Sequence, residues 1–210
     1  MRTWTAKAVA LVTVLGALLL GGALPAGAAT AEPTAAPTGS GAHRATGVVH
    51  PSTGKAWFGP DLDWGSDAPD GYEGRLDATP SMYGVEVSYP LDRPARRELL
   101  RSARAAATQG TVLVVSLEPD QALSTLTTAD ARRADTVFEQ VHRQAGTQVL
   151  VRFAPQMNGT WERWGQQPTQ FVRAFRALAQ QVHAGDSAAQ MVWSPSVSYT
   201  HLTLPTKRIV

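Results

Sequence analysis

The sequence predicts an α/β fold in which helices cover a parallel β-sheet. Short apolar runs alternate with stretches of helical periodicity, and one such unit recurs roughly every 30 to 40 residues, the length of a βαβ unit. No glycine-rich phosphate fingerprint follows the first run, where a dinucleotide-binding fold would carry one. A doubly wound sheet and a (β/α)8 barrel both satisfy these observations.

Five apolar runs are predicted to be strands: 56–62, 82–89, 111–117, 148–154 and 189–194. The fourth opens as a continuous apolar stretch, which is typical of a strand buried on both faces. Three stretches between the runs are predicted to be helices: 93–107, 129–145 and 169–183. Pro94 suits the first turn of the first helix, and the other two place apolar residues such as Val141 and Leu178 on one face.

The composition excludes several classes of protein. A chain of 210 residues with 43% hydrophobic content can bury the core of one domain. The formal net charge of +2, with no block of Lys or Arg, argues against a nucleic-acid partner. Cysteine is absent, which rules out a disulfide scaffold and a cysteine-based zinc site. We expect a monomer without metal or cofactor.

The first 29 residues have the pattern of a secretory signal peptide. Arg2 and Lys7 form a basic start, 8–24 is an unbroken run of apolar or small residues, and 26–28 offers an A-x-A cleavage site. A membrane anchor is the alternative, but the run is short for a span of about 20 residues. We therefore expect a secreted, extracellular protein that leaves the membrane on cleavage. Residues 30–46 are rich in Ala, Pro, Thr and Gly and are predicted to be a flexible linker before a folded part at 47–196.

The stretch after the fourth predicted strand concentrates polar and aromatic residues. Arg152, Gln156 and Asn158 bring hydrogen-bonding groups, and Trp161 and Trp164 bring flat aromatic faces. Polar groups bind sugar hydroxyls, while indole planes cover the C–H faces of the ring. The pattern favours a sugar-binding site, although a polar loop with core tryptophans would read similarly.

This stretch carries a family resemblance. Residues 152–165 read RFAPQMNGTWERWG, which resembles the strand-four signature of glycoside hydrolase family 26, the β-mannanase family. The family pattern is roughly Arg-x-x-His-Glu-Met-Asn-Gly-x-Trp-x-x-Trp-Gly, and its Glu is the catalytic acid/base. Pro155 stands where the family has His, and Gln156 stands where it has Glu. The resemblance decides between the two folds and implies a (β/α)8 TIM barrel, with the site at the carboxyl ends of its strands.

The resemblance also implies roles for single residues. Gln156 holds the acid/base position, and it cannot donate a proton because an amide has no accessible acid pKa, although it can hydrogen-bond the glycosidic oxygen. Arg152 matches a guanidinium that supports the active-site carboxylates, and Asn158 matches a polar residue near the sugar. Trp161 and Trp164 are expected to bind substrate by stacking, with plain packing as the alternative for Trp164.

Other strand ends add candidates. Glu118 is the second predicted catalytic residue. It belongs to a Glu-Pro pair that resembles the end of strand three in the family. The alternative is that its carboxylate caps a helix or anchors a loop. Trp193 is predicted to bind substrate. Glu162, between two tryptophans, is an alternative proton donor, since desolvation there would raise its pKa. Four further residues fall at predicted strand ends: Asp61, Asp63, Trp64 and Tyr89.

The last residues, 197–210, resemble a translated sequencing adapter and are predicted to be an artefactual tail. We therefore expect the natural protein to continue past Ser196, and the barrel to be truncated after about five βα units. The family's nucleophile, a Glu on a late strand, would lie beyond that point, so the chain by itself is expected to be inactive.

Three functions stay open. The resemblance implies a secreted glycoside hydrolase-like protein that acts on a β-linked polysaccharide, with β-mannan expected, by a retaining two-carboxylate mechanism. Pro155 and Gln156 together favour a non-catalytic carbohydrate-binding relative. The third possibility is an α/β protein of another function whose Trp-rich loop mimics the motif.

Overall fold

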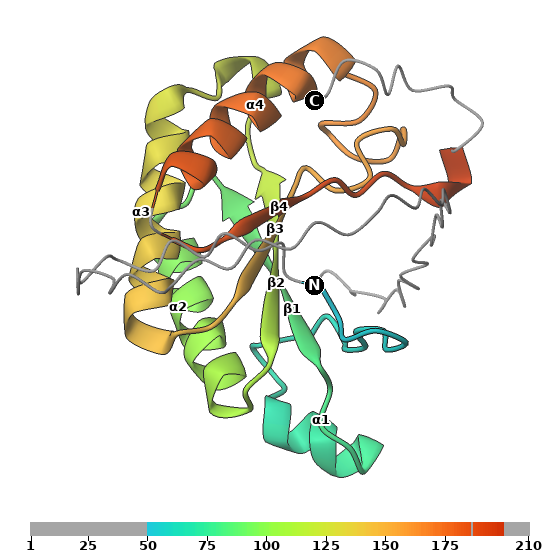
Figure 1. Ribbon diagram of the computed structural model, residues 1–210. Helices are drawn as coiled ribbons and strands as arrows, with labels where there is room; N and C mark the ends of the chain where they lie inside the picture. The colour runs from blue at the N-terminus through green and yellow to red at the C-terminus, as the bar shows by residue number, and fades with distance from the viewer. Residues whose placement is uncertain (1–49, 186, 200–210) are drawn as a thin grey trace, which may run out of the picture. The chain divides into compact units, whose positions relative to one another are not determined.

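The computed structural model describes residues 50–185 and 187–199, which form a parallel sheet flanked by helices (Figure 1). In chain order the elements are α1 (Pro69–Leu76), β1 (Met82–Tyr89), α2 (Arg93–Thr108), β2 (Val112–Pro119), η1 (Leu123–Thr125), α3 (Thr128–Ala145), β3 (Val149–Phe153), α4 (Pro168–Ala184), β4 (Gln190–Val192) and η2 (Val197–Tyr199). The predicted signal peptide and linker, and the predicted tail from residue 200, lie outside the described residues. None of the helices in the described part is long and apolar enough to cross a membrane.

The four strands lie in the order β1-β2-β3-β4, and every neighbouring pair is parallel. A helix follows each of the first three strands, so the predicted α/β class is confirmed. Across residues 50–185 and 187–199 the sheet does not close into a barrel. The strand register places Glu86 beside Ser116, and Ser116 beside Arg152.

The predicted strand at 56–62 is wrong. This segment runs beside β1 but forms a single isolated bridge, between Asp61 and Gly84. The Gly84 N–H donates to the Pro60 carbonyl and the Leu62 N–H donates to the Gly84 carbonyl. Pro60 has no backbone N–H to donate, so the hydrogen bonds between this segment and β1 cannot continue on both sides of the bridge. The fifth predicted strand is shorter than expected, because pairing is limited to Gln190–Val192.

Local signals in the sequence set the ends of the helices. The Asp92 side chain accepts a hydrogen bond from the Ala95 N–H at the start of α2. Thr127 and Asp130 form a reciprocal capping box at the start of α3. Gly146, with a φ of 66°, ends the same helix in the left-handed conformation that glycine adopts without steric cost. Helix α1 was not predicted, because Pro69 is its single buried residue and it has no apolar stripe.

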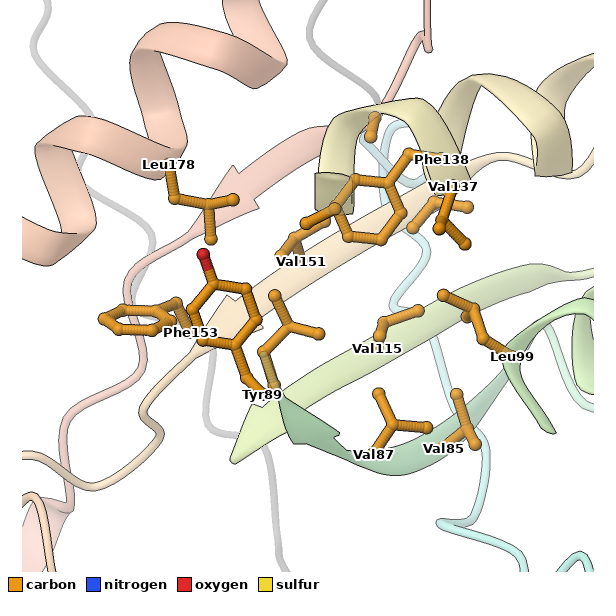
Figure 2. Close-up of a cluster of buried hydrophobic side chains, with 14 of the residues drawn as sticks. Val85, Val87, Tyr89, Leu99, Val115, Val137, Phe138, Val151, Phe153 and Leu178 are labelled. Atoms are coloured by element: carbon orange, nitrogen blue, oxygen red, sulfur yellow. The ribbon is translucent and has the colours of Figure 1, made fainter. Parts of the chain in front are cut away.

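The core lies between the sheet and helices α2, α3 and α4, which cover the same side of the sheet (Figure 1). Strand side chains alternate between the two faces, so every second residue points toward the helices. Figure 2 shows such residues from three strands, among them Val87, Val115 and Val151, packed against Leu99 of α2 and Phe138 of α3. Burial of this face fixes the register, because a slip of one residue would turn the apolar set to the other side.

Candidate active site on the uncovered face of the sheet

The face of the sheet away from the helices carries charged and polar side chains. Glu86, Ser116 and Arg152 stand side by side in one row across β1, β2 and β3, because the register aligns them. Glu118 lies two residues further toward the carboxyl end of β2 and therefore points to the same face. The sheet thus presents two glutamates and an arginine at the end where active sites of parallel α/β folds are built.

The carboxyl group of Glu118 has an unusual environment. Burial is the main reason that its pKa is raised to about 7, and the negative charges of Glu86 and Glu162 raise it further. Arg152 acts in the opposite direction, and the charge of Asp61 adds a smaller increase. The pKa of Glu86 is also raised, by desolvation first and by Asp61 second. Glu118 can therefore exist as an acid near neutral pH, which a general acid requires.

Two buried polar atoms beside Glu118 have no hydrogen-bond partner among the described residues. Arg152 is 9% exposed and its Nε is unpaired. Ser116 is 0% exposed and its Oγ is unpaired as well. A buried donor without a partner costs about 1–3 kcal/mol. The hydrogen-bonding capacity of both atoms is therefore unused within the part of the chain that the structure describes.

The loop after β3 holds the predicted sugar-binding residues. Ala154 and Gln156 have positive φ values of 46° and 58°, so the chain turns sharply where the strand ends. The Gln156 N–H donates to the Ser194 carbonyl at 2.8 Å. The Trp161 Nε1–H donates to the Gln156 Oε1 at 2.7 Å, and Trp161 is 46% exposed. The structure thus brings Gln156 and Trp161 together, with the indole open to solvent.

Gly159 makes room for the Trp161 indole. A Cβ on Gly159 would lie 2.6 Å from Trp161 Cζ2, closer than carbon atoms can approach. The Met-Asn-Gly-x-Trp pattern therefore has a steric reason in this chain, because the ring packs against the backbone of the glycine.

Asn158 and Trp164 have partners within the protein. Asn158 is buried; its Nδ2–H donates to the Ser196 carbonyl at 2.9 Å, and its Oδ1 accepts from the Ser196 N–H at 2.7 Å. Trp164 is also buried, and its Nε1–H donates to the Pro155 carbonyl at 2.8 Å. Both residues brace the loop, and their contact with substrate stays a prediction.

The remaining strand-end residues separate into two groups. Trp193, directly after β4, is 38% exposed. Tyr89, in contrast, is buried in the core with its ring 5.5 Å from that of Phe153, so its assignment to the site is wrong (Figure 2). Trp64 is buried too and donates to the Gly84 carbonyl. Asp63 accepts hydrogen bonds from the Gly65 N–H and the Ser66 hydroxyl, and so shapes its own turn.

Sequence analysis missed Glu86. The sequence nevertheless contains a signal for this residue, because a glutamate in the middle of the apolar strand 82–89 has to point away from the core.

Among the described residues, no three His, Cys, Asp or Glu side chains meet closely enough to hold a metal ion.

Parallel βα units whose helices α2, α3 and α4 all cover one side of the sheet have the arrangement of part of a (β/α) barrel. No protein-family model matches the chain, and no curated protein matches it. Among solved structures, a double mutant of an endo-β-1,4-mannanase from Cellulomonas fimi has a TM-score of 0.53 and 16% identity, over 66% of this chain and 42% of that chain. This match confirms the fold class expected from the sequence.

Two further similar structures are described as members of glycoside hydrolase family 26. GH26A from a Muricauda species has a TM-score of 0.48 and 13% identity over 64% of this chain and 55% of that chain. A modular endo-β-1,4-mannanase of family 26 from Cellulomonas fimi has a TM-score of 0.46 and 15% identity over 66% of this chain and 42% of that chain. The fold assignment rests on the first match alone. The chain spans less than two thirds of each of these proteins.

Proposed function

We propose that this chain is part of a secreted glycoside hydrolase-like protein that acts on a β-linked polysaccharide, with β-mannan as the first substrate to test. The observation that carries the proposal is the exposed Trp161 indole held by Gln156. An open indole plane of this kind binds the apolar face of a sugar ring. Glu162, the next residue, lies close enough to Glu118 to raise its pKa, which links the loop to the charged face of the sheet.

A retaining mechanism needs one protonated carboxyl and one ionised carboxylate, about 5 to 5.5 Å apart. Gln156 occupies the position that the resemblance assigns to the acid, and its amide donates hydrogen bonds but no proton. Its Oε1 is engaged by Trp161, so the amide N–H groups are the part left for a sugar oxygen. Loss of the acid costs a factor of about 10² to 10⁴ in rate.

Gln156 favours a second candidate function, a non-catalytic protein that binds the same polysaccharide. The two functions differ in one experiment. Soluble β-mannan is incubated with the full-length product of the gene and with the same protein carrying Gln156→Glu, and released reducing ends are measured. Cleavage by Gln156→Glu alone identifies the natural protein as a binder. Cleavage by both identifies another proton donor in the wild type.

Binding itself is tested by affinity electrophoresis in β-mannan, cellulose and xylan. We expect retardation by mannan, and Trp161→Ala should weaken it by at least about tenfold because the stacking surface is lost. Phe58→Ala is the matched control, since Phe58 is an exposed aromatic residue whose backbone pairs with Ser81 at the opposite end of β1. A wild-type chain that binds none of these glycans would contradict the proposal and leave an α/β protein of another function.

A further inference from the structure

The uncovered face of the sheet contains a second group that can contact the glycan. From strand spacings of about 4.8 Å and about 3.3 Å per residue, the Cα atoms of Glu86 and Arg152 each lie about 8 Å from that of Glu118. All three side chains point to the same face. Glu118 is the one nearest the carboxyl end of the strands, where the loop with Trp161 begins.

The same face holds two buried polar atoms whose hydrogen-bonding capacity is unused among the described residues. Arg152 Nε and Ser116 Oγ are buried and have no partner among the described residues. A sugar hydroxyl can accept a hydrogen bond from one group and donate one to another, so it satisfies such atoms without bringing charge. The carboxylates on this face already attract the guanidinium of Arg152, whose buried Nε has no partner among the described residues, so the face suits a neutral polyhydroxylated ligand.

We infer that Glu118 meets the bound glycan as a carboxylic acid and donates a hydrogen bond to a sugar oxygen, so that glycan affinity falls when Glu118 ionises. The inference rests on the proposed glycan function and adds its pH dependence. An ionised Glu118 can only accept hydrogen bonds, whereas the acid donates one. The charged groups that set its protonation come from four segments: Asp61 before β1, Glu86 on β1, Arg152 on β3 and Glu162 in the following loop.

The first test needs no glycan. Carboxyl carbons of ¹³C-labelled glutamate are titrated by NMR, and the Glu118 signal is assigned as the one absent from Glu118→Gln. We expect a midpoint near 7, and a lower midpoint in Glu86→Gln because a neighbouring negative charge is removed. A midpoint near the ordinary value of 4.5 would overturn the inference and leave the glycan function untouched.

The second test measures binding of β-1,4-linked mannohexaose by calorimetry at pH 5.5 and pH 8.5. We expect wild-type affinity to be roughly five- to tenfold weaker at pH 8.5, the size of one lost hydrogen bond. Glu118→Gln should bind equally at both pH values, since its amide stays a donor, and Glu118→Ala should bind weakly at both. Glu139→Gln on α3 is the control and should keep the wild-type pH dependence.

Outcomes of the second test separate the two proposals. Wild-type binding of equal strength at both pH values contradicts the role of Glu118 while the glycan function stands. An absence of binding at either pH contradicts the glycan function, whatever the titration of Glu118 shows.

Discussion

The protonation of Glu118 has a consequence for stability. Its pKa is about 7 in the folded chain, against an ordinary value of 4.5, with burial as the largest cause. The folded protein therefore holds more protons than the unfolded chain between about pH 4.5 and pH 7. The free energy of unfolding accordingly falls as the pH rises through this window, and the full cost is present above pH 7.

Glu118→Gln should remove this cost. A full shift would correspond to about 3 kcal/mol, and because Glu118 is only half-buried we expect a gain of about 1–2 kcal/mol at pH 8. At pH 3.5 the gain should be near zero, since the carboxyl is then mostly protonated in both the folded and the unfolded state. Urea unfolding at the two pH values measures the difference, with Glu139→Gln as the control. A gain of the same size at both pH values would show that packing rather than ionisation is responsible.

Gly159 sets the position of the Trp161 indole. Gly159→Ala places a Cβ 2.6 Å from the ring, so the ring has to move and its hydrogen bond to Gln156 is lost. We expect altered tryptophan fluorescence and mannan affinity reduced by about tenfold. Gly74→Ala in helix α1 is the matched control, because a Cβ added there would meet nothing within 4 Å. It should leave fluorescence unchanged and raise stability by up to about 1 kcal/mol. Unchanged mannan binding by Gly159→Ala would show that the ring position does not matter for the glycan.

At the scale of the elements, helix α3 depends on its capping box. The Thr127 Oγ1 accepts from the Asp130 N–H, and the Asp130 carboxylate accepts from the Thr127 N–H at 2.9 Å. Thr127→Ala should lower the free energy of unfolding by about 1 kcal/mol, seen as a lower urea midpoint with an unchanged slope. Thr128→Ala, one residue further on and exposed, should stay within about 0.5 kcal/mol of the wild type. Equal effects of the two changes would mean that the cap adds nothing.

The loop after β3 depends on Asn158. Its side-chain amide is hydrogen-bonded to the N–H and the carbonyl of Ser196, which lies 38 residues further along the chain. Asn158→Ala leaves these buried groups without partners and should cost about 1–3 kcal/mol. Mannan affinity measured well below the unfolding temperature then separates bracing from direct contact. Preserved affinity would identify Asn158 as a brace, and lost affinity with an unchanged urea midpoint would identify it as a sugar ligand.

The helices and the buried strands were predictable because their signals are local. The predicted helices agree with α2, α3 and α4 to within one residue at each end; they were placed at 93–107, 129–145 and 169–183. Their apolar stripes and capping residues are formed by residues close together in the sequence, so a short window is enough to detect them. The segment 56–62 was wrongly predicted to be a strand, because apolar content does not show whether the backbone pairs with a neighbouring strand. Pro60 limits the pairing of this segment with β1 to one bridge.

Residues in both the aromatic and the charged part of the site were named from the sequence, but Glu86 and the contacts between distant segments were not. A motif of consecutive residues placed Gln156 and Trp161 together, as the structure does. The pairing of Asn158 with Ser196, and the approach of Glu162 to Glu118, join segments far apart in the chain. Such contacts follow from strand register and loop path, which no short stretch of sequence encodes. Glu86 was detectable by strand alternation alone.

For the molecule as a whole, the charge of the site has the same sign as that of the predicted mature chain. The full sequence has a formal net charge of +2, but the predicted signal peptide and the predicted tail carry four of its positive charges, so residues 30–196, with 15 basic and 17 acidic residues, have a formal net charge of −2. The uncovered face of the sheet gathers carboxylates from four segments around the guanidinium of Arg152. Net charge governs weak, long-range attraction, which salt screens over about 10 Å at 0.1 M. Above pH 7, where Glu118 is ionised, the site itself should reject an anionic sugar, because a uronate would be brought close to Glu86 and Glu118 and would have to pair with a guanidinium already attracted by them.

Ionic strength separates binding at the site from long-range effects of charge. At pH 8 we expect β-mannan to retard the chain equally at 20 mM and 300 mM NaCl, since stacking on Trp161 and hydrogen bonds to neutral hydroxyls are insensitive to salt. Polygalacturonate should not retard residues 30–196 at either concentration, because the formal net charge of these residues and the charge of the site are both negative. Trp161→Ala should reduce the mannan retardation at both concentrations. Polygalacturonate binding that persists at 300 mM NaCl and is displaced by mannan would mean that the site accepts anions, because Arg152 would then outweigh the carboxylates around it.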